Sequence, residues 1–291
     1  MALLLRKDIR EDAVAREGFM ALARTVFDLD FAGWQAAGFW TDKYIPYALM
    51  DGERVIANVS VNIMDMEYRG QLRKFIQLGT VMTHPEYRGR GLARRLMEAV
   101  LADWQGRCDG VYLFANDTVL DFYPRFGFRR ATEYTHTLPL PSTAGKGRCR
   151  RLDLSAPAHL ALLRAAFERS NPYSALAMEK NWGLLMFYCG FSLKNRVYYL
   201  EEDGTAAVAR LEGDTLDCLD VFGPGGGRPL AALLADVGDG RALRARLGFT
   251  PLDGTGCTVQ PIETEDFLFV LEGGDNPFEA DRLQFPALSH A

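Results

Sequence analysis

Two glycines with one residue between them lie directly before a predicted helix. The segment reads Arg88-Gly89-Arg90-Gly91-Leu92-Ala93. Glycines let successive backbone N–H groups turn toward one point, and a helix N-terminus adds partial positive charge. The segment therefore predicts a cradle for a pyrophosphate or a similar anion. Glycines before a helix also serve simple tight turns, so this spacing alone is a weak signal.

The sequence excludes the better-known motifs for phosphates, metals and hydrolysis. The loop lacks the GxGxxG pattern of dinucleotide-binding folds, and no Gly-Lys-Ser/Thr follows it as in a Walker loop. No Gly-x-Ser-x-Gly elbow of a hydrolase is present. No metal site is predicted, because ligand spacing is absent around the four histidines, His84, His136, His159 and His290.

A second group of residues with chemical potential follows the next predicted strand. Asn116 ends that strand, and Tyr123 comes before a Pro and a Gly-Phe turn. A phenol can donate a proton where a phenylalanine cannot, which favours a functional role for Tyr123. The alternative is that Tyr123 is a core aromatic residue in a run with Phe122, Phe126 and Phe128.

Together the two segments resemble the GNAT family of acetyl-CoA-dependent N-acetyltransferases. Arg88-x-x-Gly91-x-Ala93 is similar to the family's Arg/Gln-x-x-Gly-x-Gly/Ala signature, and Asn116 followed by Phe122–Phe128 is similar to its second signature. The resemblance covers about the first 140 residues. It implies an α+β fold of three layers, with a central, mostly antiparallel twisted sheet flanked by helices.

The resemblance also implies a role for each matched position. The backbone of Val81, Met82 and Thr83 would pair with the pantetheine arm of acetyl-CoA, the co-substrate. Asn116 would hold the pantetheine or the splayed strand end, and Tyr123 would lie near the thioester sulfur. The pyrophosphate would be bound mainly through N–H groups of Arg88, Gly89, Arg90, Gly91, Leu92 and Ala93.

The mechanism that the resemblance implies is direct attack by a neutral amine on the acetyl carbonyl. A backbone N–H around Met82 would polarise that carbonyl, and Tyr123 would protonate the departing thiolate as a general acid. The base that deprotonates the amine stays open between His84, Asp65 and Glu67. Each of these three residues could instead be a solvated charge at a strand end.

The periodicity of apolar residues predicts the elements that carry these side chains. Helices are expected over 9–29, 92–104 and 117–126, with a short one carrying Trp34 and Trp40. An antiparallel meander is expected over 44–50, 55–63 and 75–83, followed by a buried strand over 111–115. The aromatic residues Trp34, Phe39 and Trp40 are expected on the acceptor side by family analogy.

The second half repeats this order in a degenerate form. A strand, an Asp-Gly turn and a strand recur at 197–211, and a strand, a Gly-rich turn and a helix follow at 216–237. Arg244–Phe249 is compared with Tyr123–Phe128, and helices are expected over 158–167 and 178–187. The turn at Gly223–Gly227 lacks the Arg-x-x-Gly-x-Ala pattern, and Pro224 and Pro229 remove N–H donors. We therefore predict a GNAT-like half without cofactor chemistry.

The segment rich in Pro, Gly and Ser after residue 138 predicts the domain boundary. We expect a catalytic acetyl-CoA-binding domain at 1–140, a linker at 141–150 and a degenerate domain with a C-terminal tail at 151–291. The tail is apolar and is expected to pack. We also hypothesise that His290 or the Ala291 carboxylate lies near the acceptor pocket.

Composition narrows the partners of the protein. The 291 residues carry 33 basic and 38 acidic side chains, a net charge of −5, which argues against binding to nucleic acid. Five scattered cysteines favour a reducing cytoplasm, and no apolar run is long enough for a membrane span. The expected partner is a small-molecule or peptide amine, with a homodimer left open. The alternative function is a non-catalytic acyl-CoA-binding or regulatory protein.

Overall fold

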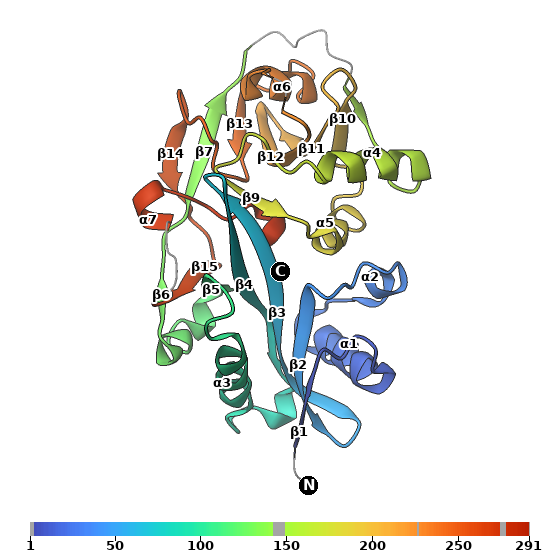
Figure 1. The fold of residues 1–291 in the computed structure, drawn as a ribbon, viewed down its shortest axis with the longest axis vertical. Coiled ribbons are helices and arrows are strands. Elements are labelled where there is room, and N and C mark those ends of the chain that lie inside the picture. The colour runs from blue at the N-terminus through green and yellow to red at the C-terminus, as the bar shows by residue number, and fades with distance from the viewer. Residues whose placement is uncertain (1–2, 142–148, 226, 274–277, 291) are drawn as a thin grey trace.

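Two β-sheets, one from each half of the chain, lie one above the other with helices on their faces (Figure 1). The computed structural model describes residues 3–141, 149–225, 227–273 and 278–290. The first sheet contains, in spatial order, β1 (Leu4–Lys7), β2 (Tyr44–Asp51), β3 (Arg54–Tyr68), β4 (Gln71–Thr83), β5 (Gly110–Ala115), β15 (Phe267–Leu271) and β6 (Phe128–Arg130), with β9 (Leu176–Glu179) beside β3.

The second sheet has the same order of pairings. It contains, in spatial order, β8 (Cys149–Arg151), β10 (Val197–Leu200), β11 (Thr205–Glu212), β12 (Thr215–Phe222), β13 (Arg244–Leu247), β7 (Tyr134–Pro139) and β14 (Thr258–Pro261). In each sheet the fourth and fifth strands of this order, β4 with β5 and β12 with β13, are parallel, and the other pairings along the order are antiparallel. The repeat suggested by the sequence is therefore present in the topology.

The first sheet contains two strands from the second half of the chain, β9 and β15, and the second sheet contains one strand from the first half, β7. Strand β15, from the end of the chain, lies between β5 and β6 of the first sheet. Strand β7, from the first half, lies between β13 and β14 of the second sheet. The sheets therefore do not follow the predicted division at 1–140 and 151–291. Most of the predicted linker, residues 142–148, lies outside the described residues, and β8 begins at Cys149.

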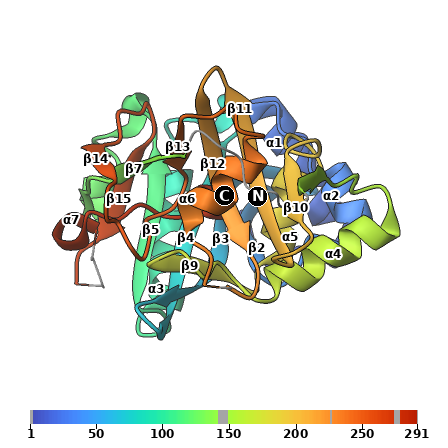
Figure 2. The ribbon, with the colours of Figure 1, turned by 90° about the horizontal axis from the view of Figure 1, so that it is seen from above.

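Helices cover both faces of each sheet. They are α1 (Ala13–Phe27), α2 (Ala32–Ala36) and α3 (Leu92–Trp104) in the first half, and α4 (Pro157–Phe167), α5 (Trp182–Cys189), α6 (Leu230–Val237) and α7 (Phe278–Asp281) in the second. In the view of Figure 2, α6 and α4 lie over the second sheet. The first sheet has α1 and α3 packed against β3, and each of the two helices belongs to its own apolar cluster.

The two main helices of the first half start and end as their sequences direct. Helix α1 follows Asp12, whose side chain accepts a hydrogen bond from the N–H of Ala15, and it ends at Asp28 in a left-handed conformation. Helix α3 buries Leu96, Val100 and Trp104, which are four residues apart, against the sheet. The predicted bounds 92–104 are confirmed.

A third apolar cluster joins the two halves. Tyr112 of β5 stacks on Phe285 of the C-terminal segment with ring centroids 3.7 Å apart, and Phe75 of β4 meets the same ring at 5.9 Å. Strand β9 of the second half pairs with β3. The C-terminal segment is thus packed between the sheets, as the apolar composition of the tail predicted.

Three local predictions were wrong. The helix expected over 117–126 is two 3₁₀ helices, η2 (Asp117–Val119) and η3 (Tyr123–Phe126), because Pro124 cannot donate inside a helix. The helix expected over 178–187 starts only at Trp182, since the residues before it form β9. Arg244–Leu247 is strand β13, so its counterpart is β5 rather than the segment at Tyr123.

The remaining predicted strands of the meander and of the repeat are confirmed within a few residues, apart from β3 and β4, which extend further into their hairpin. Trp40 lies beyond the end of α2. Within the described residues, no helix is both long and apolar enough to cross a membrane.

Candidate functional site

The loop before α3 has the conformation of an anion cradle. Gly89 and Gly91 have φ values of +75° and +71°, in the left-handed region that favours glycine. Gly91 is the N-cap of α3 and offers no side chain to the helix. The first N–H groups of α3, from Leu92 onward, therefore point out of the helix end without a capping side chain. An anionic ligand would satisfy them and benefit from the helix dipole.

Four arginines surround this loop. A cavity of about 320 Å³ is lined by the loop, by Thr83 at the end of β4, and by Phe122 and Phe126 of the following segment. The arginines in its wall are Arg88, Arg90, Arg94 and Arg125. Within the described part of the chain this wall contains no Asp or Glu. The cavity therefore suits a ligand with several negative charges.

Strands β4 and β5 diverge next to this loop. Their parallel pairing covers Phe75–Leu78 and Gly110–Leu113, after which β4 continues alone toward Thr83. On its other side β4 contains a bulge: Gly79 pairs with Ser60 and Met82 with Asn58, so β4 has one extra residue there. Thr80, inside the bulge, has a φ of +43°, which is strained for a β-branched residue.

A closed triangle of hydroxyl groups supports the strained residue. Tyr44 Oη, Ser60 Oγ and Thr80 Oγ1 lie 2.6–3.0 Å from one another. Asn58 Nδ2 donates to Ser60 Oγ at 2.9 Å and to the carbonyl of Thr80 at 3.0 Å. Burial raises the pKa of Tyr44 well above its usual range, so its phenol stays protonated. The network fixes the bulge where the strands part.

A second cavity, of about 410 Å³, opens at the bulge. Its wall includes Thr80 of β4, Phe114 of β5, Trp34 of α2 and Phe187 of α5. Thr80 lines this cavity and Thr83 lines the arginine cavity, so three residues of β4, about 10 Å of strand, connect the two. An elongated ligand along β4 would place its anionic end at the arginines and its other end here.

Of the predicted cofactor residues, the structure brings the loop and the end of β4 together. Thr83 and every residue from Arg88 to Ala93 line the arginine cavity. Val81 and Met82 lie on the stretch of β4 between the two cavities, with the Met82 side chain buried. Asn116 lies beyond the end of β5, where its Oδ1 accepts hydrogen bonds from the N–H and the hydroxyl of Thr118. Its side chain thus caps the turn that follows the strand.

Tyr123 lies in the core beside the site. Only 5% of its surface is exposed, and its ring packs against Phe122, Phe128 and Phe269. Burial raises the pKa of its phenol to about 12. The residues described for the walls of the two cavities do not include Tyr123.

The three candidate bases do not line the second cavity. His84 caps the 3₁₀ helix η1 (Pro85–Tyr87), with one ring nitrogen facing Arg54 at 2.6 Å. Asp65 is paired with Lys43. Glu67 is an exposed residue of β3, in register with Ala177 of β9. Their positions in the sequence indicated the ends of strands, but not which cavity their side chains would reach in the folded chain.

The tail contributes a residue that the sequence suggested only as a hypothesis. His290 lines the second cavity, and its ring stacks on Phe114 with centroids 3.9 Å apart. The hydroxyl of Tyr188 donates to the His290 carbonyl. Burial lowers the pKa of His290 to about 4, so its imidazole is neutral near pH 7. Ala291, the other half of the hypothesis, lies outside the described residues.

In the second half, the place that corresponds to the opening between β4 and β5 is filled by the chain itself. Strand β12 ends near Gly223, whose N–H donates to the carbonyl of Ser170. On the opposite side, Ala175 donates to the carbonyl of Thr250, which follows β13. The segment 170–175 is therefore hydrogen-bonded to the residues that follow β12 and β13. It occupies the place that is open between β4 and β5.

In the counterpart of the arginine cavity, the described residues of the wall include no unpaired cation. A cavity of about 520 Å³ lies at the turn before α6, and Arg228 is the one arginine or lysine described in its wall. Arg228 forms ion pairs with Asp203, at 2.8 Å, and with Asp236. The positive charge at this turn is thus already neutralised.

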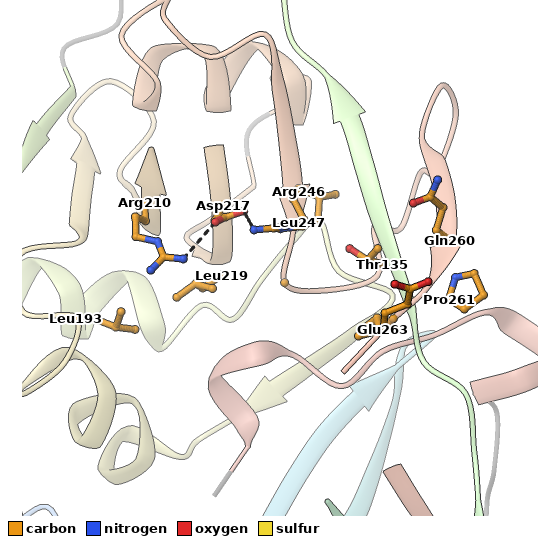
Figure 3. Close-up of a pocket in the computed structure, with 12 residues that line it drawn as sticks. Thr135, Leu193, Arg210, Asp217, Leu219, Arg246, Leu247, Gln260, Pro261 and Glu263 are labelled. Carbon is orange, nitrogen blue, oxygen red and sulfur yellow. Dashed lines mark hydrogen bonds and ion pairs between the residues drawn. The ribbon is translucent and has the colours of Figure 1, made fainter. Parts of the chain in front are cut away.

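The counterpart of the second cavity, the one at the bulge of β4, is larger and open (Figure 3). It measures about 900 Å³, and its floor holds Arg210, Asp217 and Arg246 on three neighbouring strands. Asp217 pairs with both arginines, at 3.4 and 2.6 Å. By register these residues hold the places of Asn62, Gln77 and Tyr112 in the first sheet. The second sheet thus has a network of charged side chains where the first sheet has two amides and a phenol.

No group of three or more His, Cys, Asp or Glu side chains that could hold a metal ion is found in the described residues. All five cysteines are free.

Comparisons with known proteins agree with this geometry. Residues 15–131 match the family model described as an acetyltransferase (GNAT) domain. These residues span α1 to the end of β6 and include the loop, the bulge and Tyr123. A search of curated proteins finds no match.

Solved structures share the fold of nearly the whole chain. A probable N-acyltransferase of unknown function from Enterococcus faecalis has a TM-score of 0.59 at 14% identity, covering 93% of this chain and 72% of that one. Eis1 from Mycobacterium abscessus has a TM-score of 0.57 at 18% identity, covering 92% and 73%. A GCN5-related N-acetyltransferase from Kribbella flavida has a TM-score of 0.56 at 18% identity, covering 92% and 70%. At these identities the likeness shows the fold.

Proposed function

Residues 15–131 are a GNAT acetyltransferase domain, and from that premise we propose that the protein transfers the acetyl group of acetyl-CoA to a primary amine of a small or peptidic acceptor. The family of this domain carries out acyl transfer. The observation that supports transfer from acetyl-CoA to an amine is the continuous path along β4. It runs from a cavity with four arginines to an aromatic cavity at the bulge.

The residues present fit acetyl-CoA as the co-substrate. Arg88, Arg90, Arg94 and Arg125, with the N-terminus of α3, supply positive charge for a pyrophosphate. The unpaired edge of β4 from Gly79 to Thr83 offers backbone groups to an extended amide chain, as a strand does to a peptide. Bound acetyl-CoA supplies the acetyl group that the amine receives.

The chain's own residues would then orient the reaction. A backbone N–H of the bulge, next to Met82, would donate to the carbonyl oxygen as negative charge develops there. The hydroxyl triangle holds that N–H in place through Thr80. Tyr123, whose raised pKa keeps the phenol protonated, would give its proton to the leaving sulfur. The amine proton would leave through the acceptor cavity, where neutral His290 can accept a hydrogen bond.

Acetyl-CoA binding and chemistry can be tested separately. Calorimetry with CoA should give binding to the full chain and a loss of at least tenfold in affinity for the double variant Arg88→Ala/Arg90→Ala. Arg107→Ala, at the far end of α3, serves as the matched control because Arg107 does not line the cavity. Release of free thiol from acetyl-CoA in the presence of primary amines then measures transfer.

Two observations favour the second candidate, a non-catalytic acyl-CoA-binding protein. Tyr123 is packed among three aromatic rings, and the candidate bases His84, Asp65 and Glu67 lie outside the wall of the acceptor-side cavity. CoA binding without amine-dependent thiol release, across primary amines of varied size and charge, would favour the binding protein over the transferase.

A further inference from the structure

The acceptor-side cavity is bordered by an aromatic box. Phe31, Trp34 and Tyr44 come from the first half, and Phe187 comes from α5 of the second. Their rings pack closely: the centroids of Phe31 and Phe187 are 5.7 Å apart, and those of Trp34 and Tyr44 are 5.6 Å apart. Trp34 is fixed further by a 2.7 Å hydrogen bond from its indole N–H to the Gly183 carbonyl. Such a rigid wall favours a flat apolar group.

The charge in the cavity wall is low. Among the described residues of the wall, Asp266 is the one carboxylate, and Lys43 is already paired with Asp65. His290 is neutral near pH 7 because burial lowers its pKa. An acceptor with several positive charges would lose hydration here without finding enough carboxylates. A single ammonium group, in contrast, can be drawn in by Asp266 and by the aromatic faces.

Among the described residues of the wall, one buried donor has no hydrogen-bond partner. Asn62 of β3 lines the cavity with 3% of its surface exposed, and its Nδ2 forms no hydrogen bond within the described residues. A buried donor left unpaired is unfavourable, because it has lost its hydrogen bonds to water without gaining another. An oxygen atom of the acceptor placed beside Asn62 would remove that cost. The wall therefore favours a ligand that carries a carbonyl or similar oxygen near its amine.

We propose that the acceptor is an aromatic monoamine with an oxygen acceptor close to the amino group, of the class represented by phenylalaninamide. This proposal rests on the proposed acetyl transfer. The aromatic ring would lie against Trp34 and Phe187, the oxygen at Asn62 Nδ2, and the amine at the bulge around Thr80. In the reaction the amine nitrogen forms a bond to the acetyl carbon, the carbon–sulfur bond breaks, the sulfur takes a proton and the amine loses one.

A panel of four amines tests each feature of this proposal. Phenylalaninamide against glycinamide isolates the ring, phenylalaninamide against 2-phenylethylamine isolates the oxygen, and spermidine tests a polycation. We expect kcat/KM for phenylalaninamide to exceed that for glycinamide and spermidine by at least about tenfold. Equal or faster acetylation of glycinamide or spermidine would overturn the acceptor class while leaving acetyl transfer intact.

Two variants link the selectivity to named residues. Phe187→Ala should raise KM for phenylalaninamide about tenfold or more and spare glycinamide, with Phe191→Ala, an exposed ring on the next turn, as the matched control. Asn62→Ala should reduce kcat/KM for phenylalaninamide to the value for 2-phenylethylamine. The kcat/KM for 2-phenylethylamine should be the same in the variant and the wild type. Equal losses for both amines would overturn the role of Asn62.

A failure of transfer is distinguishable from a failure of this inference. If CoA binds but no amine is acetylated, the proposed function fails, and the cavity is then judged by calorimetry with phenylalaninamide in the presence of CoA. Binding that Phe187→Ala abolishes would support the cavity as a site for aromatic amines. No detectable binding to the wild-type chain would overturn it.

Discussion

At the residue scale, the proposed chemistry depends on a phenol that the structure holds inside the core. Tyr123 packs against Phe122, Phe128 and Phe269, and burial raises its pKa to about 12. Its sequence position suggested a proton donor, while its surroundings also suit a structural aromatic residue. Replacing the hydroxyl alone separates the two roles, because a phenylalanine keeps the packing.

We expect Tyr123→Phe to lower kcat about 10²–10⁴-fold, the usual contribution of a positioned general acid. The affinity for CoA and the midpoint of thermal unfolding should change little. Because the raised pKa keeps the phenol protonated, wild-type activity should also persist to pH values near 10 without a loss due to Tyr123. Unchanged turnover in Tyr123→Phe would assign the residue to the core and leave the proton donor elsewhere.

The hydroxyl triangle is the second feature at this scale, and Ser60 is its most deeply buried member. Ser60→Ala removes one of the two acceptors for Asn58 Nδ2 and one support of Thr80. We expect kcat to fall about tenfold with KM for acetyl-CoA nearly unchanged, and the free energy of unfolding to fall by about 1–3 kcal/mol. The exposed hydroxyl of Ser192 provides a control through Ser192→Ala. An equal loss of stability with no change in kcat would mean that the triangle only supports the fold.

Buried carboxyl groups make stability depend on pH. Glu133 accepts a 2.7 Å hydrogen bond from the N–H of Phe285, and burial raises its pKa to about 7 from an ordinary value of 4.5. Asp220 is likewise raised to about 7 by burial. The folded state favours the protonated forms, so their contribution to stability is complete below the ordinary pKa. It is lost as the pH rises through about 7.

We therefore expect the free energy of unfolding in urea to be lower near pH 8.5 than near pH 6. The slope should not exceed about 1.4 kcal/mol per pH unit for each group. Glu133→Gln keeps an acceptor for Phe285 and should flatten the dependence, whereas Glu263→Gln, at an exposed position, should not. A stability that rises between these two pH values would contradict the assignment.

At the scale of elements, the sequence predicted the loop before α3 better than the strand details around it. Glycine spacing and apolar periodicity are local signals, and they fixed Arg88–Ala93 and the bounds of α3. The bulge at Thr80 depends on register with β3, and the hydroxyl triangle joins three strands. Contacts of this kind leave no periodic trace, so the sequence could not reveal them.

The two halves differ at the same element. In the first half the strands beside the loop are open, and in the second the segment 170–175 is hydrogen-bonded to the residues that follow both of them. Pro224 and Pro229 predicted the loss of the cradle, but the filling segment could not be inferred from sequence, because it lies about 50 residues before the strand end that it contacts.

This difference predicts one CoA site per chain. Calorimetry should give a stoichiometry of one, and Gly91→Ala should weaken binding at least tenfold. The left-handed φ of Gly91 costs an alanine about 1–2 kcal/mol, and the added methyl would stand in the cradle. Gly213→Ala, another left-handed glycine with open space around it, should leave CoA affinity unchanged. Two sites, or a binding curve insensitive to Gly91→Ala, would contradict the assignment of the cradle.

At the scale of the molecule, the repeat is interlocked by strand exchange. Length and the repeated order of elements predicted two similar halves, and the topology agrees. The exchange of β7 and β15 could not be predicted, because β15 pairs with β5 across about 150 residues of chain. Strand β15 connects β6 to the rest of the first sheet, because it pairs with β5 on one side and with β6 on the other.

A fragment ending at residue 141 should therefore not fold alone. It lacks β15 and the Phe285 ring that stacks on Tyr112, so β5 would have an unpaired edge and an uncovered face. We expect no cooperative unfolding transition by circular dichroism and no CoA binding, with the full chain as the control. A fragment that unfolds cooperatively and binds CoA would show that the exchange is dispensable.

The proposed function requires the first half of the chain to move an acetyl group from CoA to an amine. The most direct test is to incubate the full chain with acetyl-CoA labelled in its acetyl group and a primary amine, and to follow the label by mass spectrometry. We expect a labelled amide at the amine nitrogen with the wild-type chain and at least a tenfold slower appearance of that amide with Arg88→Ala/Arg90→Ala. Label that stays on CoA, or appears only as free acetate at the same rate with and without the amine, would contradict it.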